Sequence, residues 1–521
     1  MKPIRLMSGF LTVGGWTLLS RVLGFVRDAM ILAFLGTGPL YQAYVVAFRL
    51  PNMFRRFFAE GAFNMAFVPM FSKKLEAGDG SGDGSREAAR DFAEEALSAL
   101  AAVLIVLTLL AQLAMPWLIL ALASGFKGQP QFALSVDFGR IAFPYILFIS
   151  LAALLSGVLN ATGRFAAAAA APVLLNVLLI AAMTGAYLVG GDVARALVWG
   201  IPVAGVAQMA LVWIAARRAG FDLRPRLPRL TPEVRRLVRI AIPAALAGGV
   251  VQINLLVGQQ VASYFDKAVG WLFAADRLYQ LPLGVVGIAI GVVLLPDLSR
   301  RLAAEDHDGS RDALSRAAEV SLALTLPCAV ALVVMPLPLV SVLFERGATT
   351  PADSAGIAQA VAIYGLGLPA FVLQKIYQPL FFAREDTRSP FRYALAAMGV
   401  NAAIAMGLAP VLGWTAPAWA TTLAGWAMVA LLIRGARPMG DIARFDARFH
   451  ARIWRILAAS LLMGAVCWLA TRALDPFLYT PGLRYIALAV LILAGAMSYF
   501  AIAHVIGALR LSEFKRAFKR S

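Results

Sequence analysis

The residues best suited to chemistry in this chain are arginines placed inside stretches that are otherwise apolar. The first pair, Arg21 and Arg27, lies in the middle of the apolar segment 8–36. On a helix with 3.6 residues per turn, both fall on one polar stripe. An arginine near the centre of a bilayer costs ~3 kcal/mol or more, so each one needs an aqueous cavity or a partner. The stripe consists of Ser20, Arg21, Gly24, Arg27 and Asp28.

Two further polar groups lie in later apolar segments. Segment 41–72 is interrupted by Pro51, and its Arg56 and Glu60 are one helical turn apart, so the spacing predicts that they pair. Segment 270–299 opens with a further acid and arginine. The members of the second group are Arg49, Asn52, Arg55, Arg56, Glu60 and Asn64, and those of the third are Asp276, Arg277 and Gln280.

Across these three segments, six arginines stand against three acids. If the segments meet, the positive excess calls for an anion. A guanidinium group suits phosphate because its planar fork donates two hydrogen bonds at once and stays charged when desolvated. A diphosphate would offset most of this charge, whereas a neutral or cationic drug would not. The alternative is that the arginines extend to lipid headgroups near helix ends or form structural ion pairs.

The composition indicates a membrane protein. Hydrophobic residues make up 60% of the chain and charged residues 15%, and the mean hydropathy is +0.76. The net charge of +18 gathers in alternate gaps between apolar runs, which favours a topology signal over nucleic-acid binding. The sequence holds no Walker motif, metal-ligand cluster or nucleophile with a nearby base. We therefore expect a transporter rather than an enzyme, with no metal and no cofactor.

Apolar runs long enough to cross a hydrocarbon core of ~30 Å recur along the chain and predict an all-α polytopic protein with fourteen transmembrane helices. Because the number is even and the basic gaps alternate, both termini are expected in the cytoplasm. The predicted spans are 8–36, 41–72, 91–124, 133–160, 167–190, 195–217, 237–264, 270–299, 312–344, 354–383, 390–412, 416–435, 453–472 and 484–508.

The chain repeats itself at a nearly constant offset. Residues 69–79 match residues 296–306 at an offset of 227, and residues 47–50 match 275–278 at 228. We infer two pseudo-symmetric six-helix lobes in the same orientation, with a cavity between them and alternating access. The expected division is an N-lobe at 1–220, a cytoplasmic linker at 221–236, a C-lobe at 237–436, and two extra helices with a basic cytoplasmic tail at 437–521.

Two segments carry a resemblance to a known family. Residues 20–29, which read Ser-Arg-Val-Leu-Gly-Phe-Val-Arg-Asp-Ala, and residues 48–63 closely resemble the lipid II flippase family (MurJ/MviN) of the MOP transporter superfamily. The resemblance continues through residues 143–147, 275–278 and 294–296. It covers most of the chain, although the last hundred residues match in hydropathy only.

This resemblance implies a lipid flippase with two lobes around a cationic cavity. Such a protein moves undecaprenyl-diphosphate-linked disaccharide-pentapeptide from the cytoplasmic to the periplasmic leaflet of the bacterial inner membrane. The expected partners are this peptidoglycan precursor, membrane lipids and proteins of cell-wall synthesis and division, and the expected energy source is the membrane potential or a monovalent ion. The family's substrate-binding arginines map onto Arg21, Arg27, Arg55 and Arg277, with Asp28, Arg49, Asn52, Arg56, Glu60 and Asp276 in support.

The sequence departs from the family at one position. Members often carry an aspartate before the aromatic residue that opens the second span, whereas this chain has Gln42 between Tyr41 and Ala43. A role of an acid there in ion coupling or gating is therefore not expected in this chain.

Two rival functions fit the same residues. An exporter of another polyprenyl-linked oligosaccharide or of drugs would share the fold, and a drug exporter should tolerate neutralisation of Arg21 and Arg277. A membrane scaffold for cell-wall enzymes that transports nothing should tolerate every arginine-to-alanine change that still inserts and folds.

Overall fold

The computed structural model describes residues 6–55, 62–76 and 83–509, and every regular element in these ranges is a helix. The chain forms two compact units, residues 1–256 and 257–521. The boundary between them falls within α9 (Pro232–Ala262), a single helix of 31 residues. The predicted all-helical fold is therefore confirmed for the described residues.

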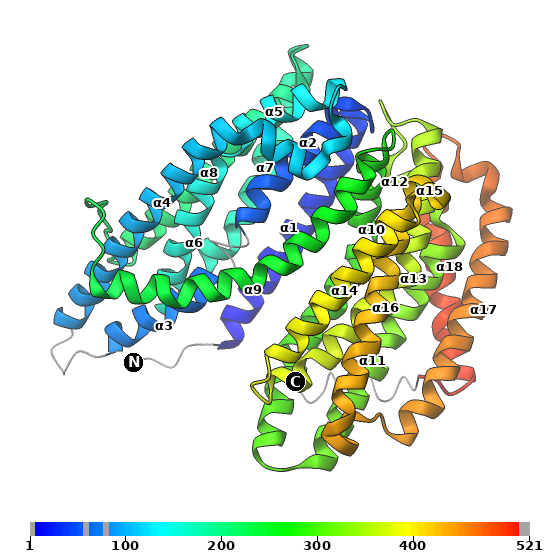
Figure 1. Cartoon of the computed structure of the whole chain (residues 1–521). Coiled ribbons are helices and arrows are strands. Elements are labelled where there is room, and N and C mark those ends of the chain that lie inside the picture. Colours follow the sequence, from blue (N-terminus) through cyan, green and yellow to red (C-terminus); the bar gives the residue numbers. More distant parts are fainter. Residues whose placement is uncertain (1–5, 56–61, 77–82, 510–521) are drawn as a thin grey trace. The chain divides into compact units, whose positions relative to one another are not determined.

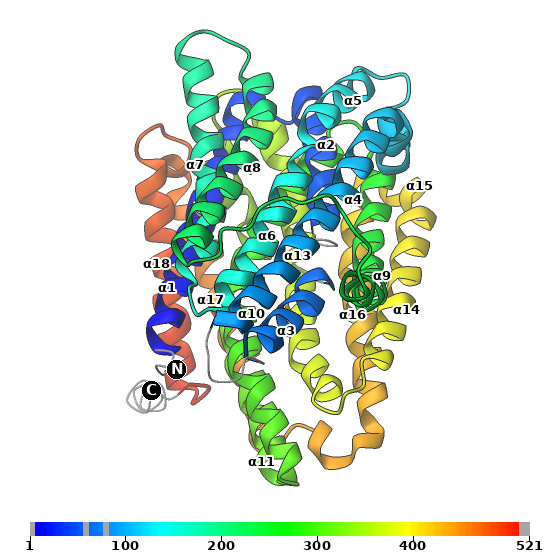
Figure 2. The ribbon, with the colours of Figure 1, turned by 90° about the vertical axis from the view of Figure 1, so that its left-hand side faces the viewer.

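The first unit holds the helices that carry Arg21 and Arg27. Its α7 packs against both α1 and α8, its α2 packs against α5, and its α6 packs against α3, α4 and α8 (Figure 2). The elements of this unit before α9 are α1 (Leu6–Leu35), α2 (Pro39–Arg55), α3 (Ala62–Glu76), α4 (Asp83–Ala123), η2 (Ser124–Phe126), α5 (Pro130–Ala142), α6 (Tyr145–Ala161), α7 (Ala166–Leu188) and α8 (Val193–Arg218).

The second unit is built around α13, which packs against α10, α11 and α16 and is buried along most of its length (Figure 1). Thr350 and Asp353 form a capping box at its start, which satisfies free backbone N–H groups of the first turn. The elements after α9 are α10 (Ala268–Ala303), α11 (His307–Val334), α12 (Pro336–Phe344), α13 (Pro351–Phe382), α14 (Arg388–Gly407), α15 (Ala409–Leu412), η3 (Gly413–Thr415), α16 (Ala416–Ala436), η4 (Arg437–Ala443), α17 (Ala447–Leu478) and α18 (Arg484–Val505).

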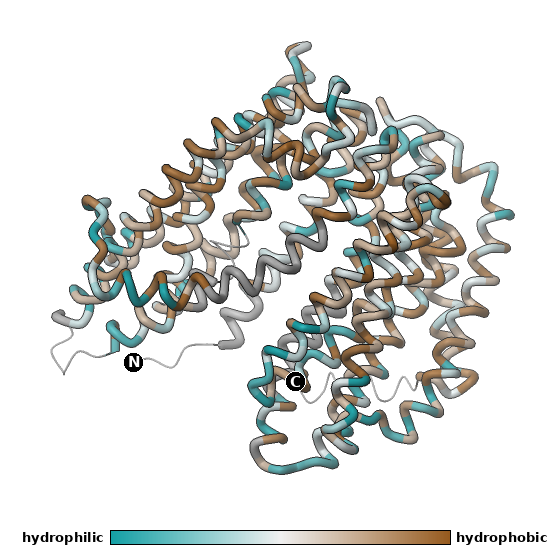
Figure 3. The backbone as a smooth tube through the Cα atoms, viewed as in Figure 1, coloured by the Kyte–Doolittle hydropathy of each residue, from teal (hydrophilic) through white to brown (hydrophobic). Residues whose placement is uncertain are grey.

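Several of these helices can span a membrane. In the described residues, nine helical segments are long and apolar enough to cross a bilayer: α4 with η2, α5 with α6, α7, α8, α11, α13, α15 to η4, α17 and α18. Figure 3 shows hydrophobic residues along the middle of α4 and hydrophilic residues toward its start. The chain is therefore a multi-pass membrane protein, and the total of fourteen spans stays a prediction.

The sequence contains two Met-Pro pairs, Met115-Pro116 and Met335-Pro336, and their local structures differ. Helix α4 continues through Met115 and Pro116 without a break. Helix α11 ends at Val334, and Pro336 begins α12, where a proline at the first helical position loses no hydrogen bond. The predicted span 312–344 is thus two helices joined at Met335, so the sequence repeat does not extend to identical helix ends.

The connection between α8 and α9 is fixed to α4. Residues 221–231 are not helical, and Figure 2 shows them crossing the first unit from the end of α8 to the start of α9. The backbone N–H of Arg224 donates to Glu94 Oε1 at 3.0 Å, and that of Arg226 donates to Ser98 Oγ at 2.9 Å. The Arg226 guanidinium also lies 2.6 Å from Glu94 Oε2. Because Glu94 has no exposed surface, this attachment is part of the core of the unit.

In the second unit, α17 is joined to α11 by a group of charges that we call the arginine clasp: Arg316, Glu319, Asp446, Arg448 and Arg452. Glu319 is 4% exposed and accepts hydrogen bonds from all three arginines. Asp446 pairs with Arg316 and accepts the backbone N–H of Phe449 at 2.7 Å, which caps the first turn of α17. Apolar packing alone does not fix α17; a buried ionic contact fixes it as well.

Candidate functional site

Helix α1 carries two of the predicted substrate-binding residues in different surroundings. Arg21 is exposed, and among the described residues it forms no ion pair with a carboxylate. Arg27 is only 8% exposed. Its Nη2 lies 2.6 Å from Oδ1 of the adjacent Asp28, and its Nε donates to the same oxygen at 2.9 Å. Arg21 therefore has its donors available, whereas Arg27 is already bound to an acid.

An amide on α7 completes the surroundings of Arg27. The Nη1 of Arg27 donates to Asn176 Oδ1 at 2.8 Å, and the Nδ2 of Asn176 donates to the backbone oxygen of Ser20 at 2.9 Å. Between these contacts lies Gly24, where an added Cβ would come within 3.6 Å of the same amide. The stripe formed by Ser20, Gly24 and Arg27 thus receives Asn176 as the polar contact between α1 and α7.

Two tyrosines lie next to this network. Tyr44 on α2 and Tyr145 on α6 are both almost fully buried and are electrostatic neighbours of the Arg27 guanidinium. Tyr145 also donates to Gln208 Oε1 at 3.1 Å, and Gln208 donates onward to the backbone oxygen of Ala171. Arg27 therefore belongs to a buried polar region that extends across five helices, α1, α2, α6, α7 and α8.

Helix α2 carries the second predicted group. Arg49, Asn52 and Arg55 are all partly buried, and Asn52 donates to the backbone oxygen of Phe48 one turn earlier, at 3.0 Å. Arg56 and Glu60 lie outside the described residues, so their predicted pairing stays a prediction.

Gln42, the position where the sequence departs from the family, lies near the start of α2. Its side chain is 1% exposed, and neither its Nε2 nor its Oε1 has a hydrogen-bond partner among the described residues. An unsatisfied buried amide of this kind lowers the free energy of unfolding by ~1–3 kcal/mol.

The second unit holds the fourth predicted arginine, Arg277 on α10. Its guanidinium lies over the ring of Phe273, with Cζ 4.4 Å from the ring centroid, which is a cation–π contact. The neighbouring Asp276 accepts a hydrogen bond from Gln280, one turn later. Both side chains are partly buried.

Asn176 is a functional partner of Arg27 that the sequence analysis did not find, because the two residues are 149 positions apart. The regular spacing of Ser20, Gly24 and Arg27 was the available signal, since it predicts that a helix approaches on that face. Within the described part of the chain, no group of three His, Cys, Asp or Glu residues could hold a metal ion. Each unit thus carries guanidinium donors inside its apolar helices, and such donors can bind an anion.

A scan against family models matches residues 31–488 to the model described as lipid II flippase MurJ. The chain is 46% identical to the probable lipid II flippase MurJ of Rhizobium meliloti (strain 1021), over 99% of this chain and 96% of the relative. It is 33% identical to the lipid II flippase MurJ of Burkholderia cenocepacia, over 99% of this chain and 100% of the relative.

Two solved structures share the fold. A lipid II flippase MurJ in an inward closed conformation aligns with a TM-score of 0.79 at 22% identity, covering 95% of this chain and 98% of the other. An inward-facing multidrug resistance MATE transporter of the MOP superfamily aligns with a TM-score of 0.66 at 15% identity, covering 82% of this chain and 96% of the other. These likenesses show the fold expected of the superfamily.

Proposed function

The chain belongs to the MurJ lipid II flippase family, and from this premise we propose that it moves lipid II, the undecaprenyl-diphosphate-linked peptidoglycan precursor, from the cytoplasmic to the periplasmic leaflet. The observation that carries this proposal is the family match over residues 31–488. The family is one of transporters and not of enzymes, and it places the chain in the bacterial inner membrane. The precursor is the partner of the site, with both termini on the cytoplasmic side and no bound cofactor.

The site residues divide into two roles. Arg21 contacts the diphosphate, because it is exposed and has no carboxylate partner among the described residues. Arg27 supports it, because Asp28 and Asn176 already hold its guanidinium in one orientation. Arg55 and Arg277 supply further guanidinium groups, whose planar forks match phosphate oxygens. Arg49, Asn52, Arg56, Glu60 and Asp276 act in support.

Alternating access moves this charged site between the two sides of the membrane. Moving one charge across 100 mV changes the free energy by ~2.3 kcal/mol, so the membrane potential or a coupled monovalent ion can bias the step. The lipid tail stays in the bilayer along α17 and α18. These helices expose large apolar side chains, including Leu461, Leu469, Leu493 and Met497, as a surface in contact with hydrocarbon does.

The test is a flipping assay with purified protein in liposomes that contain lipid II. Arg21→Ala is expected to abolish flipping, and Arg27→Ala and Arg277→Ala to reduce it strongly. Arg21→Ala and Arg277→Ala should insert and unfold like the wild type, whereas Arg27→Ala should also lower the free energy of unfolding, because it removes a buried ion pair with Asp28. Arg195→Ala is the matched control, because Arg195 is an exposed arginine near the start of α8 outside the site.

The outcomes separate this function from its rivals. Normal flipping by Arg21→Ala and Arg277→Ala would remove these arginines from the mechanism. A drug exporter would flip no lipid II in this assay, and its own transport would tolerate both substitutions. Normal exposure of lipid II at the outer leaflet in cells depleted of the protein would contradict the flippase assignment itself. A scaffold would complement the depletion with every variant that folds.

A further inference from the structure

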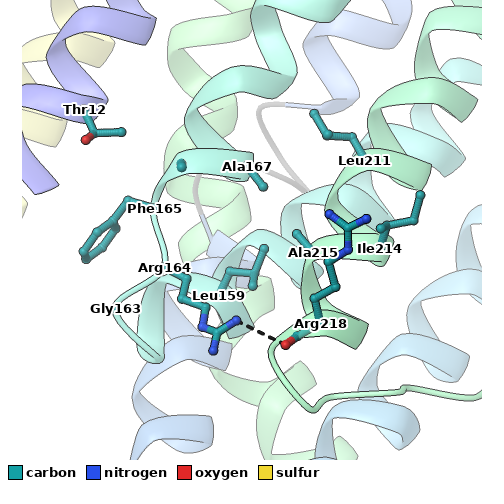
Figure 4. A pocket seen from close by; sticks show the side chains of 11 residues that line it. Thr12, Leu159, Gly163, Arg164, Phe165, Ala167, Leu211, Ile214, Ala215 and Arg218 are labelled. Carbon is teal, nitrogen blue, oxygen red and sulfur yellow. Dashed lines mark hydrogen bonds between the residues drawn. The ribbon is translucent and has the colours of Figure 1, made fainter.

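A cavity of about 740 Å³ lies in the first unit, at the end where α6 stops, α7 starts and α8 stops (Figure 4). None of the arginines of the candidate site lines it. Its volume falls within the ~300–1,000 Å³ typical of small-molecule sites. Helices α6, α7 and α8 all belong to segments that can span a bilayer, so we expect their shared end at the level of the lipid headgroups.

Two arginines border the cavity from different elements. Arg164 comes from the turn between α6 and α7, and its Nη1 donates to the backbone oxygen of Arg218, the last residue of α8, at 3.3 Å. Both side chains are exposed, and among the described residues neither forms an ion pair with a carboxylate. The guanidinium of Arg218 extends beside Leu211 and Ile214 in Figure 4. The cavity therefore has a positive edge with no acidic residue in its lining.

The start of α7 adds to this positive edge. Phe165, Ala166 and Ala167 line the cavity, and no side chain caps the first turn of this 23-residue helix. The backbone N–H groups of an uncapped first turn lack helical partners and carry the positive end of the helix dipole. Together with the arginines, they make the edge complementary to phosphate.

The rest of the lining is apolar. Leu159, Leu211 and Ile214 form a wall beside the arginines, and Ile214 is 49% exposed. A free inorganic anion would make no favourable contact with this apolar wall, whereas the first methylene groups of an acyl chain would pack against it. A molecule that fits both parts has a phosphate joined to a hydrocarbon tail.

We propose that this cavity binds an anionic glycerophospholipid of the bilayer, with its phosphate on Arg164, Arg218 and the start of α7 and its acyl chain along Leu211 and Ile214. This lipid is distinct from the one that is transported. Because the bound lipid contacts α6, α7 and α8, it stabilises the packing of these three helices at the headgroup level. The proposal does not depend on the flipping activity, since lipid binding is measured directly.

The experiment titrates delipidated full-length protein with phosphatidylglycerol and counts bound lipid by native mass spectrometry. The double variant Arg164→Gln/Arg218→Gln is expected to weaken binding by about tenfold or more. Arg218→Gln alone is expected to weaken it less, because the backbone oxygen that accepts from Arg164 is retained. Ile214→Glu is expected to abolish binding, because it puts a carboxylate beside the two arginines. If the double variant does not fold, these two single variants carry the test.

Arg217→Gln is the matched control, because Arg217 precedes Arg218, pairs with Asp222 at 3.0 Å and does not line the cavity. Its binding should equal that of the wild type. Equal binding by Arg218→Gln and Ile214→Glu, or an equal loss with Arg217→Gln, would overturn the site. Full displacement of phosphatidylglycerol by inorganic phosphate would overturn the role of the acyl chain, and binding of phosphatidylcholine as tight as phosphatidylglycerol would overturn the preference for anionic lipid.

Discussion

Arg21 and Arg27 lie six positions apart on one helix, yet only Arg27 is held by other side chains. Asp28 supplies a carboxylate and Asn176 an amide oxygen, so the charge of Arg27 is largely compensated inside the protein. Arg21 has no such carboxylate among the described residues. An arginine in an apolar segment that has no carboxylate partner is a candidate for binding an anionic ligand. For this reason we place Arg21 closest to the diphosphate.

Asn176→Leu should weaken both the fold and transport. The substitution removes the acceptor at 2.8 Å from Arg27 and the donor to the Ser20 oxygen, so a buried guanidinium loses a partner. We expect the free energy of unfolding to fall by ~1–3 kcal/mol and the flipping rate to fall with it. Thermal unfolding in detergent and the liposome assay measure the two effects. Asn160→Ala, at an exposed amide on α6, is the control, and an unchanged Asn176→Leu protein would contradict the network.

At the scale of elements, the arginine clasp decides how α17 is held. Glu319→Ala should leave three arginines, one of them the nearly buried Arg452, without their shared carboxylate. Removing one partner of a buried ion pair costs ~3–5 kcal/mol, so we expect a large loss of stability by chemical unfolding. Asp441→Asn, in the exposed pair of Asp441 with Arg444, should change stability little. Equal effects of the two substitutions would show that the clasp does not hold α17.

The pH dependence of the clasp follows from Asp446. Burial alone would raise the pKa of Asp446, but the N–H of Phe449 and the guanidinium of Arg316 outweigh it and hold the pKa below its usual range. A carboxyl whose pKa is lowered on folding stabilises the protein above its unfolded pKa, ~3.9, and loses that contribution as the pH falls through the folded value. We therefore expect the stability due to Asp446, measured against Asp446→Asn, to be constant near neutral pH and to decline only in acid.

The connection between α8 and α9 should resist proteolysis even though it is rich in arginine. The trypsin site after Arg226 lies in backbone that is held on α4 through Glu94 and Ser98, whereas the bond after Arg224 precedes Pro225 and is not cleaved by trypsin. Glu94→Ala removes the buried acceptor, and we expect cleavage in residues 221–231 to become several-fold faster in a time course followed by mass spectrometry. Glu87→Ala, at an exposed residue of the same helix, should leave the rate unchanged. Fast cleavage of the wild type would show that the segment is not held on α4.

At the scale of the whole molecule, α9 is the helix that the two compact units share, and it contains the pair Gly248-Gly249. Glycine lowers helix stability by ~1 kcal/mol relative to alanine, so the pair is a place where the helix bends at low cost. We expect Gly248→Ala/Gly249→Ala to slow flipping without lowering the free energy of unfolding. Gly185→Ala on α7, where an added Cβ meets nothing within 4 Å, is the control. An unchanged flipping rate would place the bending elsewhere.

Much of this organisation is visible in the sequence, and the reasons for the rest are physical. Apolar runs and the Ser20 to Asp28 stripe follow from local periodicity, which a single sequence carries. Arg27 and Glu319 also have partners on helices more than a hundred positions away, and no local pattern encodes such contacts. The break of the predicted span 312–344 at Met335 could not be read from the Met-Pro sequence. Pro336 begins a new helix, whereas Pro116 lies inside a continuous one.

The connection between α8 and α9 is attached to α4 at three points, Arg224, Arg226 and Thr231. A connection without such contacts could change its conformation when α8 moves, and α9 would then not move with it. Here the last of these contacts, from Thr231 to Glu95, lies directly before the start of α9. We therefore expect a movement of α4 to reach the start of α9 through these contacts.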